Sequence, residues 1–197
     1  MMVKICGITN HEDAVAAIGA GASAIGFNFY RDSPRYIAPT GAVLIAEKLP
    51  DDVIKVGVFV DEPDEAIARI GLQVGLDVAQ LHGATSSSTL RVWRAWPVTG
   101  DSHLTMLEDP VAEAFLLDSF SRFIHGGTGT TFPWKLARDV KQRIIVAGGL
   151  DESNVEQAIE EARPWGVDAC SRIEASPGKK DHEKMRRFIA AALRSGL

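Results

Sequence analysis

Two ionisable side chains stand where short apolar runs end, and together they could carry out acid–base chemistry. Cys6 closes the run that begins at Met2, and Asp118 closes the run that begins at Ala114. An α/β protein places its reactive groups at the carboxyl ends of its parallel strands. A thiolate there can accept a proton and a carboxylic acid can donate one. The sequence therefore offers a base and an acid, although cysteine is also among the residues most often buried for packing alone.

Arg35, Gln80 and His82 are three further polar residues close to apolar runs. Arg35 carries a two-pronged cation that suits a carboxylate ligand, although any surface arginine would look the same in isolation. Gln80 and His82 lie at the end of the run 78–82, where a hydrogen-bonded structural histidine is the alternative interpretation. All three are candidates for ligand contacts.

A glycine pair, Gly148 and Gly149, marks a candidate anion site. It closes the run 143–148, and Ser171 follows the run 166–170. In barrel enzymes the loops after strands seven and eight form the usual phosphate site, with donors from backbone N–H groups and a short extra helix. A tight turn without a ligand is the alternative, and the spacing alone favours neither interpretation.

The segment 125–130 is a candidate closing loop. Its glycines at 126, 127 and 129 are not followed by the Lys-Ser/Thr pair of a nucleotide-binding P-loop. A loop of this length and glycine content is typical of a segment that closes over a ligand. An ordinary surface loop is the alternative.

Eight apolar runs of strand length must position these residues. We expect strands near 2–6, 24–29, 53–60, 78–82, 91–98, 114–118, 143–148 and 166–170. Some runs are apolar throughout, which is typical of parallel strands buried on both faces. Eight strands, each followed by a helix, predict a closed (β/α)8 TIM barrel, with an open doubly wound sheet as the alternative. Only the segment 84–90 joins the fourth and fifth strands, so we expect helix 4 to be shortened or vestigial.

Local residue patterns also predict where some helices begin and which face they bury. Thr9 with Glu12, and Ser153 with Glu156, have the spacing of capping boxes. One apolar helical face near the end of the chain predicts a C-terminal helix, and it comprises Met185, Phe188, Ile189, Ala192 and Leu193.

Composition narrows the class of protein. A chain of 197 residues can bury a full core and shows no linker, so we expect a single domain over 1–197. The net charge is −5 with scattered Lys and Arg, which argues against a nucleic-acid partner. No apolar run reaches membrane-spanning length and no signal-peptide layout is seen, so we expect a cytoplasmic protein without membrane contact.

Cysteine and histidine usage points away from metals. There is no CxxC, no HExxH and no histidine pair at ligand spacing, so we expect no metal. Cys6 and Cys170 are expected to be free thiols rather than a disulfide. The scattered charge is compatible with a phosphorylated ligand, because backbone donors bind phosphate without a basic patch.

Several short motifs, taken together, resemble one enzyme family, phosphoribosylanthranilate isomerase. They follow one another in the family's order over almost the whole chain and comprise 4–9 (KICGIT), 33–35 (SPR), 56–59 (VGVF), 80–83 (QLHG), 116–119 (LLDS), 126–129 (GGTG), 147–150 (AGGL) with Asn154-Val155, and 176–181 (SPGKKD). Each motif alone would be a weak signal. Their joint match identifies the chain as a member of that family.

The resemblance implies a cofactor-independent Amadori rearrangement in tryptophan biosynthesis. N-(5-phosphoribosyl)anthranilate would become 1-(2-carboxyphenylamino)-1-deoxyribulose 5-phosphate. Asp118 would be the general acid that protonates the furanose ring oxygen, and Cys6 the general base that removes the proton from C2. The expected substrate contacts are Arg35 to the anthranilate carboxylate, with Gln80, His82, Gly127, Gly148, Gly149, Ser171 and Arg172. The oligomeric state is expected to be monomer or homodimer.

Three departures from the family pattern stand out. Cys170-Ser171-Arg172 replaces a Ser-Ser-Gly-like run, so Arg172 could add charge to the phosphate site or strain a backbone built for a small residue. Thr130 and Pro133 stand where lysine and aspartate are common. Helix 4 is nearly absent. Two alternatives stay open: a histidine-pathway or bifunctional sugar-phosphate isomerase, and a catalytically impaired phosphate-binding barrel.

Overall fold

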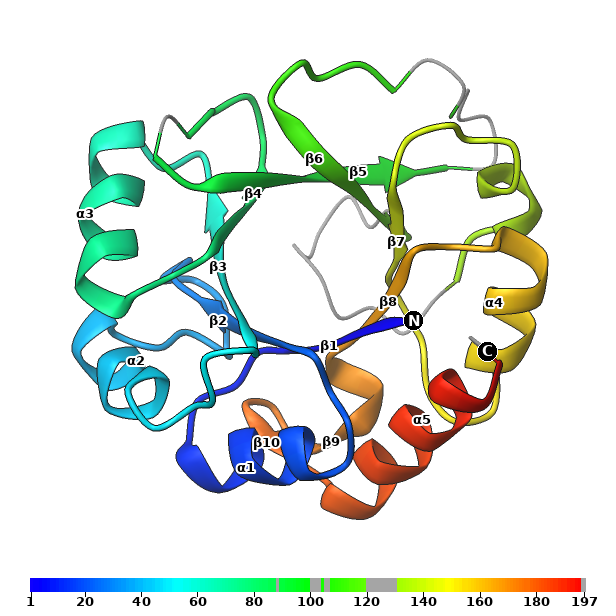
Figure 1. Cartoon of the computed structure of the whole chain (residues 1–197), viewed down its shortest axis with the longest axis horizontal. Coiled ribbons are helices and arrows are strands. Elements are labelled where there is room, and N and C mark those ends of the chain that lie inside the picture. Colours follow the sequence, from blue (N-terminus) through cyan, green and yellow to red (C-terminus); the bar gives the residue numbers. More distant parts are fainter. Residues whose placement is uncertain (88, 100–103, 105–106, 120–130, 196–197) are drawn as a thin grey trace.

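Eight parallel strands close into a barrel in the computed structural model, which describes residues 1–197 except 88, 100–103, 105–106, 120–130 and 196–197. Figure 1 shows the barrel end on, with the first strand beside the last. The strands are β1 (Met2–Cys6), β2 (Ala24–Asn28), β3 (Ile54–Val60), β4 (Val78–His82), β5 (Arg91–Val98), β6 (Ala112–Ser119), β7 (Ile144–Val146) and β8 (Gly166–Ala169). The predicted (β/α)8 barrel is confirmed, and the open doubly wound sheet is wrong.

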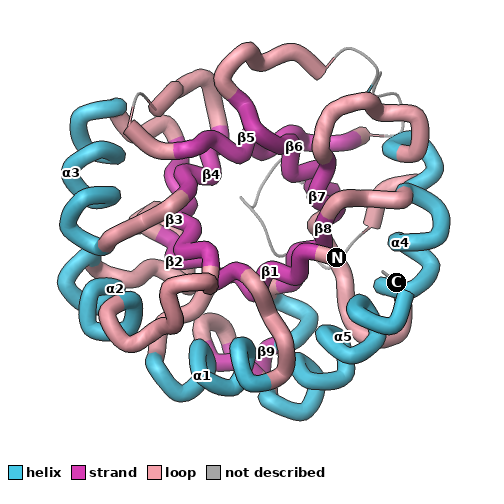
Figure 2. The backbone as a smooth tube through the Cα atoms, viewed as in Figure 1, coloured by secondary structure: helices cyan, strands magenta, loops and turns pink. Residues whose placement is uncertain are grey.

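The ring of helices around the barrel is incomplete. Its α-helices are α1 (His11–Gly19), α2 (Pro39–Ala46), α3 (Asp64–Val74), α4 (Val155–Ala162) and α5 (His182–Ser195). Figure 2 shows them outside β1 to β3 and beside β7 and β8, whereas loops cover β5. In the described parts of the chain, no α-helix follows β4 or β5, and only the short 3-10 helix η2 (Trp134–Ala137) follows β6. Residues 100–103, 105–106 and 120–130, which follow β5 and β6, lie outside the described residues, so our expectation of a helix after these two strands stays a prediction.

Both predicted capping boxes are also wrong. Asn10, not Thr9, caps α1, because its side chain accepts a hydrogen bond from the N–H of Asp13. The Thr9 hydroxyl instead donates to the Gly178 carbonyl at 2.5 Å. The Ser153 hydroxyl donates to Asp151, so it does not cap α4. In both cases the hydroxyl donates a hydrogen bond to an acceptor outside the helix, instead of accepting one from a backbone N–H at the start of the helix.

The barrel interior changes character along its axis. Because successive side chains in a strand point to opposite faces, Met2, Lys4 and Cys6 of β1 share one face. An apolar cluster that includes Met2 and Trp93 packs inside one end. Lys4 lies deeper than Cys6 and is fully buried. Polar side chains therefore gather toward the carboxyl ends of the strands, where barrel enzymes carry their sites.

A short extension between β8 and α5 completes this end of the barrel. It contains the 3-10 helix η3 (Ser171–Ile173) and the antiparallel pair β9 (Glu174–Ser176) and β10 (Lys179–Lys180). The helix α5 then packs against α1, α4 and β1 through the predicted apolar face, with Met185 and Phe188 buried. None of the helices described is both long and apolar enough to cross a membrane.

Candidate active site

One cavity at the carboxyl ends of the strands collects the residues that the sequence singled out. Lining it are Cys6, Arg35, Gln80, His82, Asp118, Gly148, Gly149, Ser171 and Arg172. They come from six different strand ends or the loops after them, so only barrel closure could bring them together. Gly127 and Thr130 lie outside the described residues, as does the candidate closing loop.

Cys6 is a thiol prepared to lose its proton. It ends β1 and is 8% exposed, with the Cys170 thiol and the Lys4 ammonium as hydrogen-bonding neighbours. The hydrogen bond from Cys170 and the positive charge of Lys4 hold the pKa of Cys6 well below its ordinary value, although burial acts in the opposite direction. Cys6 can therefore serve as a base near neutral pH.

Lys4 forms a buried ion pair beneath this thiol. Its Nζ lies 2.9 Å from Oδ1 of Asp168 on the adjacent strand β8. Burial disfavours the charged ammonium, but Asp168 and Cys6 raise the pKa of Lys4 above its ordinary value, so the cation persists. Burial raises the pKa of Asp168 to about 7 against the opposing charge of Lys4. A fixed positive charge thus lies below the cavity floor.

The pKa of Asp118 is shifted in the direction opposite to that of Cys6. Burial, and then the negative charge of Cys6, raise the pKa of Asp118 to about 6, while Lys4 and hydrogen bonds from Ser119 oppose the rise. A carboxyl group with this pKa is protonated in part near neutral pH and can donate. The cavity thus holds one group shifted toward the base form and one toward the acid form, which is the arrangement that proton-transfer enzymes use.

Gly148 allows the loop after β7 to approach Asp118. Its φ is +81°, and a Cβ at this position would collide with the Asp118 carboxylate and with Ser119. Only glycine satisfies both the left-handed backbone and the close approach. The loop is held further by Asn154, whose Nδ2 donates to the Gly149 carbonyl at 2.8 Å.

Arg172 ties the loop after β8 to the loop after β7. Its Nε donates to Oδ2 of Asp151 at 2.7 Å, and its Nη2 lies 2.6 Å from the same oxygen. Among the described residues, the only non-glycine residues with positive φ are Asp61 and Arg163. The alternative that Arg172 strains a backbone built for glycine is therefore wrong.

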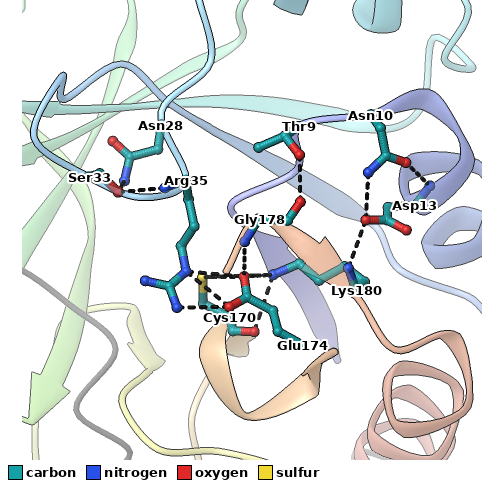
Figure 3. A network of polar contacts seen from close by, with 10 residues as sticks. All are labelled: Thr9, Asn10, Asp13, Asn28, Ser33, Arg35, Cys170, Glu174, Gly178 and Lys180. Carbon is teal, nitrogen blue, oxygen red and sulfur yellow. Dashed lines mark hydrogen bonds and ion pairs between the residues drawn. The ribbon is translucent and has the colours of Figure 1, made fainter. Parts of the chain in front are cut away.

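Arg35 is held in place by a carboxylate. Its Nε and Nη2 donate to Glu174 at 2.8–3.2 Å, and Glu174 also accepts from Lys180 at 2.9 Å (Figure 3). Although burial disfavours its charged form, the bonds from Arg35 and Lys180 hold the pKa of Glu174 below its ordinary value. Ser33 supports the loop from the other side, because its Oγ accepts from the Arg35 N–H.

Gln80 and His82 project from β4 into the same cavity. Nε2 of Gln80 and Nε2 of His82 are 3.2 Å apart. Oε1 of Gln80 is buried and has no hydrogen-bond partner within the described residues. A buried amide oxygen of this kind is a ready acceptor for a ligand hydroxyl or N–H group.

The sequence reasoning missed several residues of this cavity. Asn28, Tyr30, Ser33, Asp168 and Cys170 line it, and Lys4 lies beneath it. The signal that could have revealed Lys4 and Asp168 is strand alternation, because each stands two positions before a cysteine on an inward-facing strand. Both cysteines are free thiols, as predicted. The described part of the chain holds no cluster of three or more metal-ligating side chains.

Enzymes built on a closed (β/α)8 barrel carry their active sites at the carboxyl ends of the strands, and the fold and the position of this cavity assign the chain to that class. The sequence model of the family described as N-(5'phosphoribosyl)anthranilate (PRA) isomerase matches residues 3–191. This chain belongs to that family, which confirms the resemblance inferred from its motifs.

Individual relatives of known name match this chain over almost their whole length. A Solibacter usitatus protein named N-(5'-phosphoribosyl)anthranilate isomerase is 50% identical over 196 residues, covering 98% of this chain and 97% of its own. The crystal structure of phosphoribosyl anthranilate isomerase from Thermus thermophilus is 37% identical, with a TM-score of 0.89 and coverage of 98% and 99%. A solved family structure in complex with reduced 1-(o-carboxyphenylamino)-1-deoxyribulose 5-phosphate is 38% identical, with a TM-score of 0.84 and the same coverage.

Proposed function

We propose that the chain converts N-(5-phosphoribosyl)anthranilate to 1-(2-carboxyphenylamino)-1-deoxyribulose 5-phosphate in tryptophan biosynthesis, with Asp118 as acid and Cys6 as base. The observation that carries the assignment is that both groups line one cavity and that their pKa values are shifted in opposite directions. Family membership supports the reaction, and the complex of a relative with a reduced form of the product supports a phosphorylated ligand.

The proton movements follow from the protonation states. Asp118 gives its proton to the furanose ring oxygen as the bond from that oxygen to C1 breaks, and the anthranilate nitrogen supplies the electron pair that forms a Schiff base. Cys6 then takes the proton from C2, and that electron pair forms the C1–C2 double bond while the C1–N double bond becomes single. The resulting enolamine tautomerises to the ketone as C1 gains a proton and the C2 hydroxyl loses one. The first two steps each move a proton that one of the two groups is prepared to give or take.

Charged ends of the substrate are assigned to opposite sides of the cavity. The bonds to Glu174 occupy Nε and Nη2 of Arg35, so we assign its Nη1 to the anthranilate carboxylate. Backbone N–H groups at Gly148, Gly149 and Ser171 are assigned to the phosphate, with Arg172 at the edge of that site. Two anchors fix the sugar between acid and base, which lowers the entropic part of the barrier.

A steady-state assay of the purified chain with phosphoribosylanthranilate and with the histidine-pathway aminoaldose tests the proposal. We expect turnover of the first substrate alone. Cys6→Ser and Asp118→Asn should each lower kcat by roughly 100-fold or more with little change in KM, as removal of a general base or acid does. Glu160→Gln, at an exposed position on α4, is the matched control and should leave both constants unchanged.

Turnover of both aminoaldoses would replace the proposal with a bifunctional isomerase. No turnover of either would identify an impaired phosphate-binding barrel. Near-full kcat in either active-site variant would remove that residue from its assigned role.

A further inference from the structure

The two cysteines of the chain stand side by side at the cavity. Cys6 closes β1, Cys170 directly follows β8, and the residues before them, Ile5 and Ala169, are register partners in the sheet. Neighbouring strands lie about 4.8 Å apart. This separation falls within the Cα–Cα range of about 4.4–6.8 Å that a disulfide spans. Both side chains line the cavity, so a small solute that enters it reaches both.

The thiols also face each other. The Cys170 thiol donates a hydrogen bond to the Cys6 sulfur. Their neighbours are glycines that leave space: a Cβ at Gly7 would lie 3.0 Å from Sγ of Cys170, and one at Gly26 would lie 3.0 Å from Sγ of Cys6. Glycine at these two positions leaves room for the sulfurs, and Sγ of Cys170 also lies 4.0 Å from Oε1 of Glu174.

Each sulfur has its own buried cation. The Lys4 ammonium hydrogen-bonds Cys6, and Nζ of Lys180 lies 3.8 Å from Sγ of Cys170 (Figure 3). Lys4 and Lys180 are both fully buried. A nearby cation stabilises a thiolate, and the thiolate is the form that attacks peroxides and other sulfur atoms. Cys6 is prepared to react first and Cys170 to react second.

We propose that Cys6 and Cys170 form a reversible redox site that reacts with a hydroperoxide and closes as an intramolecular disulfide. The Cys6 thiolate attacks the peroxide O–O bond, so a sulfur–oxygen bond forms, the O–O bond breaks, and Cys6 becomes a sulfenic acid while the peroxide is reduced to an alcohol or water. Cys170 then attacks the Cys6 sulfur. The S–S bond forms, the S–O bond breaks, and hydroxide leaves with the Cys170 proton as water.

The disulfide has two consequences. It occupies the sulfur that serves as base, so the enzyme stops until a dithiol reductant restores both thiols. It also protects Cys6 from the sulfinic and sulfonic acids, which such a reductant does not reverse. The loss of activity rests on the proposed role of Cys6, whereas disulfide formation does not.

Peroxide treatment of the whole purified chain, followed by mass spectrometry without reduction and by activity before and after dithiothreitol, tests this inference. We expect the parent to lose two hydrogens in mass and to yield a peptide that links Cys6 to Cys170. Its activity should fall and then return with dithiothreitol. Cys170→Ser, which keeps a hydrogen-bond donor beside Cys6, should gain oxygen atoms at Cys6 and recover little of its own starting activity.

Cys6→Ser under the same peroxide dose should keep its Cys170 thiol, because the first reactive group is gone. Oxygen atoms on Cys6 of the parent without a linked peptide would overturn the redox site, and so would equal recovery of the parent and Cys170→Ser. A linked peptide in a chain that keeps full activity would leave the disulfide standing and remove Cys6 from its role as base.

Discussion

At the scale of single residues, the site depends on one buried cation that acts on two groups. Lys4 lowers the pKa of Cys6 and also opposes the rise in the pKa of Asp118. Burial alone would make both groups neutral, which suits the acid but not the base. Lys4 does not line the cavity, so it acts through Cys6 rather than on a ligand. The hydrogen bond from Cys170 also lowers the pKa of Cys6 and is the larger of the two effects.

The pH dependence of kcat/KM should follow from these shifts and be bell-shaped. Activity rises with pH as Cys6 loses its proton, in a range below the ordinary thiol pKa, because a base must be deprotonated. It falls as pH rises through the pKa of Asp118, about 6, because an acid must be protonated. A pH profile measured on the free enzyme checks both limbs. A profile that keeps rising through neutral pH would contradict the role of Asp118.

Lys4→Met should move the pKa of Cys6 upward, because the positive charge beside the thiolate is lost. The measurement is the rate of Cys6 alkylation by iodoacetamide against pH, together with the acidic limb of kcat/KM, and both should shift to higher pH. Lys48→Met, at an exposed position, is the control. The double variant Lys4→Met/Asp168→Asn avoids an unpaired buried carboxylate and should show the same shift. An unmoved alkylation profile in both variants would exclude Lys4 from this role.

At the scale of elements, the loops after β7 and β8 form one unit. The Asp151 carboxylate accepts hydrogen bonds from Arg172 in the loop after β8 and from Ser153 in the loop after β7. The Asn154 side chain donates a hydrogen bond to the Gly149 carbonyl. The unit places the loop after β7 against Asp118. Its geometry requires glycine at 148, where the chain passes closest to the acid.

Gly148→Ala should therefore abolish most activity, and Gly75→Ala provides a matched control. Both glycines have positive φ, +81° and +72°, so both variants should lose about 1–2 kcal/mol of stability from the left-handed backbone. A Cβ at Gly75 meets nothing within 4 Å, whereas one at Gly148 meets Asp118. Urea unfolding and kcat measured on both variants separate the two effects. Equal activity in the two variants would show that the approach of the loop to Asp118 is unimportant.

At the scale of the whole molecule, pairing of the first strand with the last closes the barrel. β1 pairs with β8, so the first and last strands hold each other, and α5 covers the closure by packing on β1. Cys6, Cys170 and the Lys4–Asp168 pair all lie at this seam. The β1–β8 pair that closes the barrel therefore also carries Cys6, the proposed base.

Phe188→Ala in α5 should lower the free energy of unfolding by about 3–5 kcal/mol, because the ring is fully buried and its removal leaves a cavity. Leu72→Ala on α3 is the control, since that side chain is 88% exposed and should change stability by less than about 0.5 kcal/mol. Urea unfolding followed by circular dichroism measures both. If the two variants were equally stable, α5 would not hold the seam closed.

The sequence by itself determined the barrel, its strand positions and the two groups proposed as acid and base. Apolar runs of strand length report burial on both sheet faces, and their ends mark the carboxyl edge, so the order of the runs makes Cys6 and Asp118 candidates, to which the family resemblance adds the roles of base and acid. Strand bounds agree with prediction within about two residues, because hydrophobic periodicity is a local property of the chain.

Side-chain partners were decided only by the tertiary structure. Which residue faces Cys6 depends on which strand closes the barrel beside β1, and the spacing of 164 residues between Lys4 and Asp168 carries no local signal. Thr9 donates to the Gly178 carbonyl instead of capping α1, and Arg172 donates to Asp151. Both acceptors are distant in sequence and are brought close only by the fold. Local pattern selects the elements; competition among partners far apart in the chain selects the contacts that tune their chemistry.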